Sequence, residues 1–180
     1  MNPIEVISQF YERDTDLWRI LVEHSEAVAD FALRIVDSHP ELGADRQFVY
    51  EGAMLHDIGI IKTDAPGIHC YGDSPYICHG TLGAEMLRGL GMERHALVCE
   101  RHTGAGLSLE DIERQDLPIP HRDMLPLSVE EKIICYADKY FSKSKELRVA
   151  KSYEKALKSV AKFGEDSERR FLEMHEKFGK

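Results

Sequence analysis

Two histidines and two aspartates stand where the sequence predicts buried helical surfaces. His24 interrupts an apolar stripe whose residues recur every three or four positions. His56 and Asp57 are adjacent at the end of a second apolar segment, and Asp138 interrupts the apolar string IICYADKYF. A buried carboxylate without a partner is destabilising, so each aspartate needs a cation, hydrogen-bond donors or a metal. Two imidazoles and two carboxylates that converge inside a bundle suit a divalent ion such as manganese, iron, zinc or magnesium.

These side chains must be positioned by helices, because apolar residues recur at helical spacing along most of the chain. The pattern predicts helices over 15–37, 45–56, 80–90, 92–102, 128–143, 152–163 and 167–178. Gly59 is expected to end the second helix in the left-handed conformation, and Ser128 with Glu131 has the spacing of a capping box. Pro and Gly interrupt the segments 62–78 and 103–127, which we expect to be functional loops. Neither strand alternation nor an internal repeat is visible, so the predicted fold class is all-α.

Length and composition predict one folded domain over residues 1–180, with its core at about 15–143. The helices over 152–178 are expected to pack on this core or to form the interface of a homodimer. Hydrophobic residues make up 43% of the chain, and 23 basic against 32 acidic residues give a net charge of −9, which argues against a nucleic-acid partner. The N-terminus lacks the pattern of a signal peptide, and no apolar run is long enough for a membrane span. We therefore expect a cytoplasmic protein with no membrane partner.

The four cysteines and the other histidines have simpler interpretations. The four cysteines form no CxxC pair and are expected to be buried free thiols, with a zinc knuckle of Cys70, Cys78 and nearby histidines as the alternative. Five histidines lack any pattern and are expected at the surface: His39, His69, His95, His121 and His175. His79 and His102 stand at predicted helix ends, where a histidine can also serve as a cap or favour the helix dipole.

The four residues of the first group, in their order along predicted helices, resemble the signature of the HD superfamily of metal-dependent phosphohydrolases. The string HDIG at 56–59 resembles the HDIG branch in particular. This likeness covers about residues 20–142. It implies a single-domain helical bundle of the HD-domain type, with a metal site between core helices and one or two divalent ions per chain as cofactors. Iron or manganese is favoured, and zinc, magnesium, nickel and cobalt are alternatives.

The resemblance also implies how the ligands would be shared between two ions. His79 and His102 lie where two-metal members of the superfamily place additional ligands. Asp57 would bridge the two ions. The first ion would be held by His24, His56 and Asp138, and the second by His79 and His102.

Such a centre would hydrolyse a phosphoester. A divalent ion lowers the pKa of bound water toward neutrality, which makes hydroxide available at pH 7, and it neutralises charge on the phosphoryl group. We therefore expect a small phosphorylated substrate, a phosphomonoester or a nucleotide, and a catalytic role for Asp57. Members of the superfamily often carry a lysine directly after HDIG; here Lys62 lies two residues later and is the leading candidate to orient the phosphate. Four further candidates for substrate binding are His69, Tyr71, Arg101 and Lys139.

Two other functions share this pattern. A few HD-fold enzymes use a mixed-valent di-iron pair to activate oxygen, and their six-ligand sets do not differ in sequence from those of hydrolases. A degenerate HD domain can act as a non-catalytic nucleotide-sensing module, but none of the six ligands is missing here. The GYP string of cyclic-di-GMP phosphodiesterases is absent after His102, where the chain reads TGAGLSLED, so we do not expect cyclic-di-GMP hydrolysis.

Overall fold

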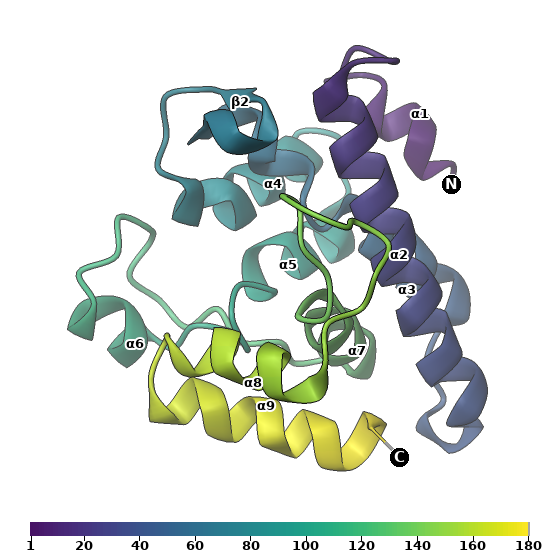
Figure 1. The fold of residues 1–180 in the computed structure, drawn as a ribbon, viewed down its shortest axis with the longest axis vertical. Helices are drawn as coiled ribbons and strands as arrows, with labels where there is room; N and C mark the ends of the chain where they lie inside the picture. The colour runs from purple at the N-terminus through teal and green to yellow at the C-terminus, as the bar shows by residue number, and fades with distance from the viewer. Residues whose placement is uncertain (180) are drawn as a thin grey trace.

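The long helix α2 (Asp16–Ser38) forms one side of the molecule in the computed structural model, which describes residues 1–179 (Figure 1). Thr15 begins this helix, because its side chain accepts a hydrogen bond from a backbone N–H of the first turn. The predicted apolar stripe of α2 is buried, and the helix packs on α3 (Arg46–Leu55) and α7 (Val129–Asp138). These three helices form the centre of the bundle, as the periodicity of the sequence predicts.

Helices α4 (His79–Arg88) and α5 (Glu93–Arg101) pack against each other and cover a second face. Their connection turns at Gly91, whose φ of +73° lies in the region that glycine adopts without strain. Helix α5 also contacts α3 and α7, and the short helix α1 (Pro3–Ile7) packs on α3. Apolar residues of α1, α4 and α5 form a second hydrophobic cluster beside the one between α2, α3 and α7.

The segment after α3 does not turn away through a left-handed glycine. It continues as a 3-10 helix, η2 (Ile58–Lys62), and Gly59 within it does not have a positive φ. A Cβ atom at Gly59 would lie 2.1 Å from the His79 carbonyl oxygen and 2.4 Å from the Gly83 nitrogen. The predicted role of Gly59 was therefore wrong: glycine is needed there because η2 packs backbone to backbone on α4.

The two predicted loops contain short regular elements. In 62–78, strands β1 (Asp64–Ala65) and β2 (Cys70–Tyr71) pair in an antiparallel hairpin. In 103–127, helix α6 (Leu109–Arg114) begins with a complete capping box. The hairpin is the exception to an otherwise helical chain over residues 1–179, and strands of two residues are too short to produce a visible alternation.

Helix α7 ends at Asp138, five residues before the predicted end at 143. Ser128 begins it as predicted, by accepting a hydrogen bond from the Glu131 N–H, but the Glu131 carboxylate accepts from the Leu127 N–H, so only half of the capping box forms. Beyond Asp138, backbone N–H groups bond to carbonyl groups three residues back instead of four. The chain then leaves the helix, which frees the following side chains to turn toward the interior.

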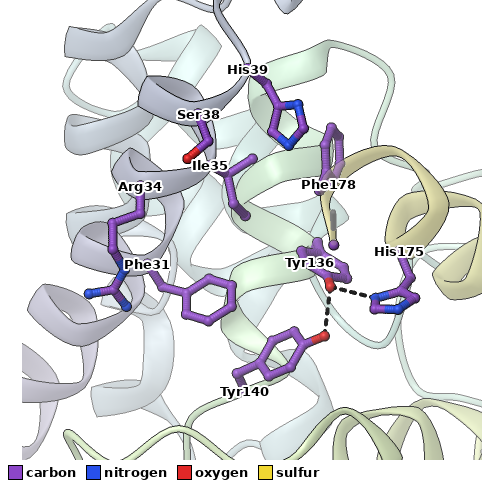
Figure 2. A pocket seen from close by; sticks show the side chains of 10 residues that line it. Phe31, Arg34, Ile35, Ser38, His39, Tyr136, Tyr140, His175 and Phe178 are labelled. Atoms are coloured by element: carbon purple, nitrogen blue, oxygen red, sulfur yellow. Dashed lines mark hydrogen bonds between the residues drawn. The ribbon is translucent and has the colours of Figure 1, made fainter.

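Helices α8 (Tyr153–Ala161) and α9 (Glu165–Phe178) pack on each other, and α9 lies against α7 (Figure 1). Gly164 joins them with a φ of +114°. His175 on α9 is half-buried in the aromatic contact between α7 and α9, and its Nδ1 lies 2.8 Å from the Tyr136 hydroxyl (Figure 2). The expectation that His175 is a surface residue was therefore wrong. No helix of the described chain is both long and apolar enough to cross a membrane.

Candidate metal centre

The first four predicted ligands meet in the interior of the bundle. His24 comes from the middle of α2, and Asp138 is the last residue of α7; His56 and Asp57 directly follow α3. His24 Nε2 lies 3.1 Å from Asp57 Oδ2 and 3.0 Å from Asp138 Oδ1. His56 Nε2 lies 3.1 and 3.2 Å from the same two oxygen atoms. One ligand atom from each of the four buried residues therefore lies within 4.8 Å of the others, which is close enough for all four to hold one ion.

The other carboxylate oxygen of Asp57 faces a second pair of imidazoles. His79 is the first residue of α4 and His102 directly follows α5, so the packing of these helices brings both side chains to one place. Their Nε2 atoms lie 3.4 and 3.3 Å from Asp57 Oδ1 and 3.1 Å from each other. The two groups of ligands share Asp57, whose carboxylate stands between them.

Three of the imidazoles are oriented by the same hydrogen bond. In each, Nδ1 lies 2.6–2.7 Å from the carbonyl oxygen of the residue three positions earlier: His56 with Ala53, His79 with Tyr76, and His102 with Cys99. A carbonyl can only accept, so Nδ1 carries a proton and Nε2 is directed to the centre as the ligand atom. Hydrogen bonds of this kind fix the ring and tautomer of metal-binding histidines. The buried Nδ1 of His24 has no partner among the described residues.

The centre holds negative charge that the protein itself does not fully satisfy. Asp57 is fully buried, and neither of its oxygen atoms has a hydrogen-bond partner in the described chain. Lys143 Nζ approaches Oδ2 to 2.8 Å, but without hydrogen-bond geometry. Lys139 Nζ lies 2.6 Å from Asp138 Oδ2 and donates to the His102 carbonyl at 2.8 Å. An unsatisfied buried carboxylate surrounded by imidazoles fits the coordination of a divalent ion.

Burial and neighbouring charges favour an ionised Asp57 and neutral imidazoles at His79 and His102, whereas without a metal they keep a proton on His56. Burial opposes ionisation of Asp57, but His56 and Lys143 outweigh it and hold the pKa of this carboxyl well below its usual range. Burial lowers the pKa of His102 and lowers that of His79 to about 3, so both imidazoles are neutral. Burial also disfavours the cationic form of His56, yet Asp57 and the second carboxylate raise its pKa to about 10. The centre attracts positive charge strongly enough to hold a proton on an imidazole.

The cysteines lie outside this cluster. All four are buried and free, and burial raises the pKa of Cys70 and Cys135 to about 11, so their thiols stay protonated at neutral pH. Cys78 Sγ contacts the Pro118 carbonyl. Neither Cys70 nor Cys78 belongs to a group of three potential ligands in residues 1–179, so the geometry provides no zinc knuckle there.

The five residues predicted to bind substrate lie in different parts of the structure. Lys139 lies at the cluster, in the pocket that opens onto it. Lys62 and Tyr71 are exposed and line a different hollow. His69 is exposed in the left-handed conformation, and Arg101 is engaged in an ion pair with a carboxylate of α7. Of these five residues, Lys139 is therefore the one that lies beside the predicted metal ligands.

One cation at the centre was not predicted. Lys143 lies five residues beyond Asp138, and in a helix continuing to 143 it would project about 140° away from Asp138. Because α7 ends at Asp138, the chain reverses and brings the Lys143 ammonium to Asp57. The pocket that opens onto the cluster has a volume of about 200 Å³ and is lined by Lys143 together with His79 and His102. The lysine-rich string KYFSKSK was the only available signal.

Comparison with known proteins agrees with this geometry. The uncharacterized protein MJ0778 of Methanocaldococcus jannaschii is 38% identical over 143 residues, which cover 76% of this chain and 77% of that protein. The tRNA (cytidine(56)-2'-O)-methyltransferases of Picrophilus torridus and Thermoplasma volcanium are 36% and 31% identical, with matches that cover 68% and 86% of this chain. These matches span only 32% and 40% of the two methyltransferases. No solved structure matches the chain. The HD domain family matches residues 21–142, more than half of the chain, and the protein belongs to this family.

Proposed function

We propose that the protein is a metal-dependent phosphohydrolase that cleaves a small phosphomonoester or nucleotide. The observation that carries this proposal is the carboxylate of Asp57, which is buried, lacks hydrogen-bond partners and directs its two oxygen atoms to two different groups of ligands. A carboxylate in this position is suited to bridge two ions.

Each ligand has a distinct place in the proposed centre. The first ion would be held by His24, His56, Asp57 and Asp138, and the second by Asp57, His79 and His102. When bound, divalent ions supply hydroxide at neutral pH and neutralise charge on the phosphoryl oxygen atoms. Ligands that are all nitrogen and oxygen favour iron or manganese, with zinc, magnesium, nickel and cobalt as alternatives.

The protein's own residues position these groups and surround them. The carbonyl groups of α3 and α5 fix two imidazole rings, so that little reorganisation is needed when the ligands are used. The six proposed ligands are all buried, so water reaches the centre through the pocket beside Lys139 and Lys143. Both ammonium groups can donate to phosphoryl oxygen atoms at this opening.

The test is release of inorganic phosphate from a panel of phosphomonoesters, nucleotides and phosphodiesters by protein loaded anaerobically with iron or with manganese. We expect metal-dependent hydrolysis of at least one phosphomonoester, and its loss on chelation. Iron-dependent oxygen consumption with a member of the panel, without phosphate release, would favour the di-iron oxygenase instead. Nucleotide binding without turnover under either condition would favour a sensing module.

The names of the two methyltransferase relatives do not define this function. This chain spans less than half of each of those enzymes, so a part of them that has no counterpart here can account for methyl transfer. The net charge of −9 also disfavours a polynucleotide as substrate. We therefore propose a small phosphorylated molecule, with no nucleic-acid partner.

A further inference from the structure

Three lysines converge at the pocket that opens onto the metal centre. Lys139, Lys143 and Lys151 all line this pocket, beside two of the proposed histidine ligands. They belong to the connection between α7 and α8, residues 139–152, which is the green segment in Figure 1. A chain with a net charge of −9 thus concentrates positive charge at one opening.

This connection is held in place by contacts with the bundle. The Lys151 N–H donates to the Tyr140 carbonyl at 2.7 Å, and the side chain of Leu147 is buried. Arg148 forms an ion pair with Glu26 of α2. The lysines are therefore carried by anchored backbone, which reduces the conformational entropy lost when they bind a ligand together.

When the centre holds metal ions, the carboxylates that face Lys139 and Lys143 no longer neutralise these lysines alone. Lys143 Nζ lies 2.8 Å from Asp57 Oδ2, and Lys139 Nζ lies 2.6 Å from Asp138 Oδ2. The same carboxylates are proposed metal ligands, and a ligand that neutralises a divalent ion no longer neutralises a lysine. Burial lowers the pKa of Lys151; Asp138 opposes this change, and the neighbouring lysines add to it. The group therefore has an electrostatic requirement for an anion.

A second hollow continues outward from this pocket. The two share four wall residues: Tyr76, Phe141, Lys143 and Lys151. The remaining walls of the outer hollow are Ala65, Gly67, Ile68, Ser142 and Ser144. Its volume is about 410 Å³, against about 200 Å³ for the inner pocket, and falls in the range of small-molecule sites. The inner pocket is thus the smaller of the two and is lined by three lysines, whereas the outer hollow is larger and shares two of them.

We propose that Lys139, Lys143 and Lys151 form an anion subsite for the phosphoryl group of a phosphomonoester whose organic part, of nucleoside size, occupies the outer hollow. This inference rests on the proposed function, because the subsite presents the same phosphoryl group to the metal centre. Ammonium groups make strong charge-assisted hydrogen bonds with phosphate oxygen atoms. The inner pocket, with a volume of about 200 Å³, has room for a phosphate group.

The first test measures binding and needs no turnover. Inorganic phosphate is titrated calorimetrically into manganese-loaded wild-type protein and into Lys143→Gln, Lys151→Gln and Lys155→Gln. Lys155 is an exposed lysine of α8 that does not line the pocket, and it is the matched control. We expect the Kd for phosphate to rise about tenfold in Lys143→Gln and about threefold or more in Lys151→Gln, with less than a twofold change in Lys155→Gln.

Metal content, measured in the same samples, separates the subsite from the metal centre. We expect it to be unchanged in all three variants, and Lys143→Arg to restore phosphate binding to within about threefold of wild type because it keeps the charge. Unchanged phosphate affinity in both pocket variants would overturn the proposal, and so would loss of metal from Lys143→Gln. If lysine-dependent phosphate binding is found but no phosphomonoester is hydrolysed, the subsite stands and the proposed reaction fails.

The second test addresses the outer hollow through Gly67. A Cβ atom at Gly67 would have no neighbour within 4 Å, so a large side chain can be added there without a clash at its base. We expect Gly67→Trp to weaken binding of adenosine monophosphate about fivefold or more while leaving the affinity for inorganic phosphate unchanged. Equal effects on both ligands, or no effect on either, would contradict the assignment of the organic part to this hollow.

Discussion

Asp57 and Asp111 are both fully buried carboxylates, yet their surroundings differ completely. Asp111 Oδ2 accepts hydrogen bonds from the Ser108 N–H at 3.0 Å and from Arg170 at 2.6 Å, and its Oδ1 accepts from Arg114 at 2.9 Å. Asp57 has no hydrogen-bond partner for either oxygen among the described residues. Asp111 connects α6 to α9, whereas Asp57 stands between two groups of imidazoles.

This difference shows that burial alone does not distinguish a structural carboxylate from a functional one. A carboxylate whose hydrogen-bonding capacity is filled by guanidinium and amide groups stabilises the folded state. A carboxylate without hydrogen bonds at the centre of a ligand cluster is available to bind a metal ion. Substitution of Asp57 should therefore act on metal binding, and substitution of Asp111 on stability.

Replacement of Asp57 should have the largest effect. In Asp57→Ala both groups of ligands lose their shared member, and we expect activity to fall on the order of a thousandfold or more with loss of bound metal. Phosphate release and elemental analysis of both proteins test this pair of expectations. A variant that keeps its metal and its activity would make Asp57 a structural residue.

Replacement of Asp111 should have the reverse effect. In Asp111→Asn the hydrogen bonds to two guanidinium groups lose their charge, and we expect the free energy of unfolding to fall by about 1–3 kcal/mol. Metal content and kcat per folded molecule should remain within about twofold of wild type, because no ligand of the centre has changed. A specific loss of metal in Asp111→Asn, at unchanged stability, would remove the distinction between the two carboxylates.

The pH dependence of stability sharpens the comparison at Asp111. Burial opposes ionisation of Asp111, but the Ser108 N–H and Arg170 outweigh it and lower its pKa below the usual 3.8. Its contribution is therefore fully present above the unfolded pKa and is lost as pH falls through the folded pKa. The stability difference between wild type and Asp111→Asn should be constant from pH 7 to about pH 5 and shrink below 3.8. Urea unfolding of both proteins at pH 7, 5 and 3.5 checks this; a difference that grows on acidification would contradict it.

The smallest effect is expected at Lys62. Its side chain is exposed and lines a hollow that none of the proposed metal ligands lines. We expect Lys62→Gln to change kcat/KM for a phosphomonoester by less than about twofold, as is usual for a surface substitution. A tenfold rise in KM would instead place Lys62 at the phosphate and support the sequence-based prediction that Lys62 orients it.

Much of this architecture could be predicted from the sequence. Helical spacing located α2, α3 and α7, and the order of His24, His56-Asp57 and Asp138 along them located the cluster. Periodicity carries this information because one face of each helix must be buried.

The failures have physical causes as well. Gly59 was assigned to helix termination from its local sequence alone. Its observed role depends on the approach of η2 to α4, a tertiary contact that the local sequence does not contain. Lys143 was missed because no Pro or Gly marks the end of α7 in the sequence. The change to hydrogen bonds that span three residues after Asp138 was therefore not predicted. The role of Lys62 stays a prediction, because it was assigned from its distance to HDIG in sequence; the lysines that the structure places at the two carboxylates are Lys139 and Lys143.

The most direct test of the bridging role of Asp57 is the metal content per chain, by elemental mass spectrometry, of protein purified without chelator or added metal. Wild type and His79→Ala are compared, because His79 belongs only to the second group of ligands. We expect about two ions per chain in wild type and about one in His79→Ala, with iron or manganese predominant. A single ion in wild type that is unchanged in His79→Ala would contradict the two-ion centre.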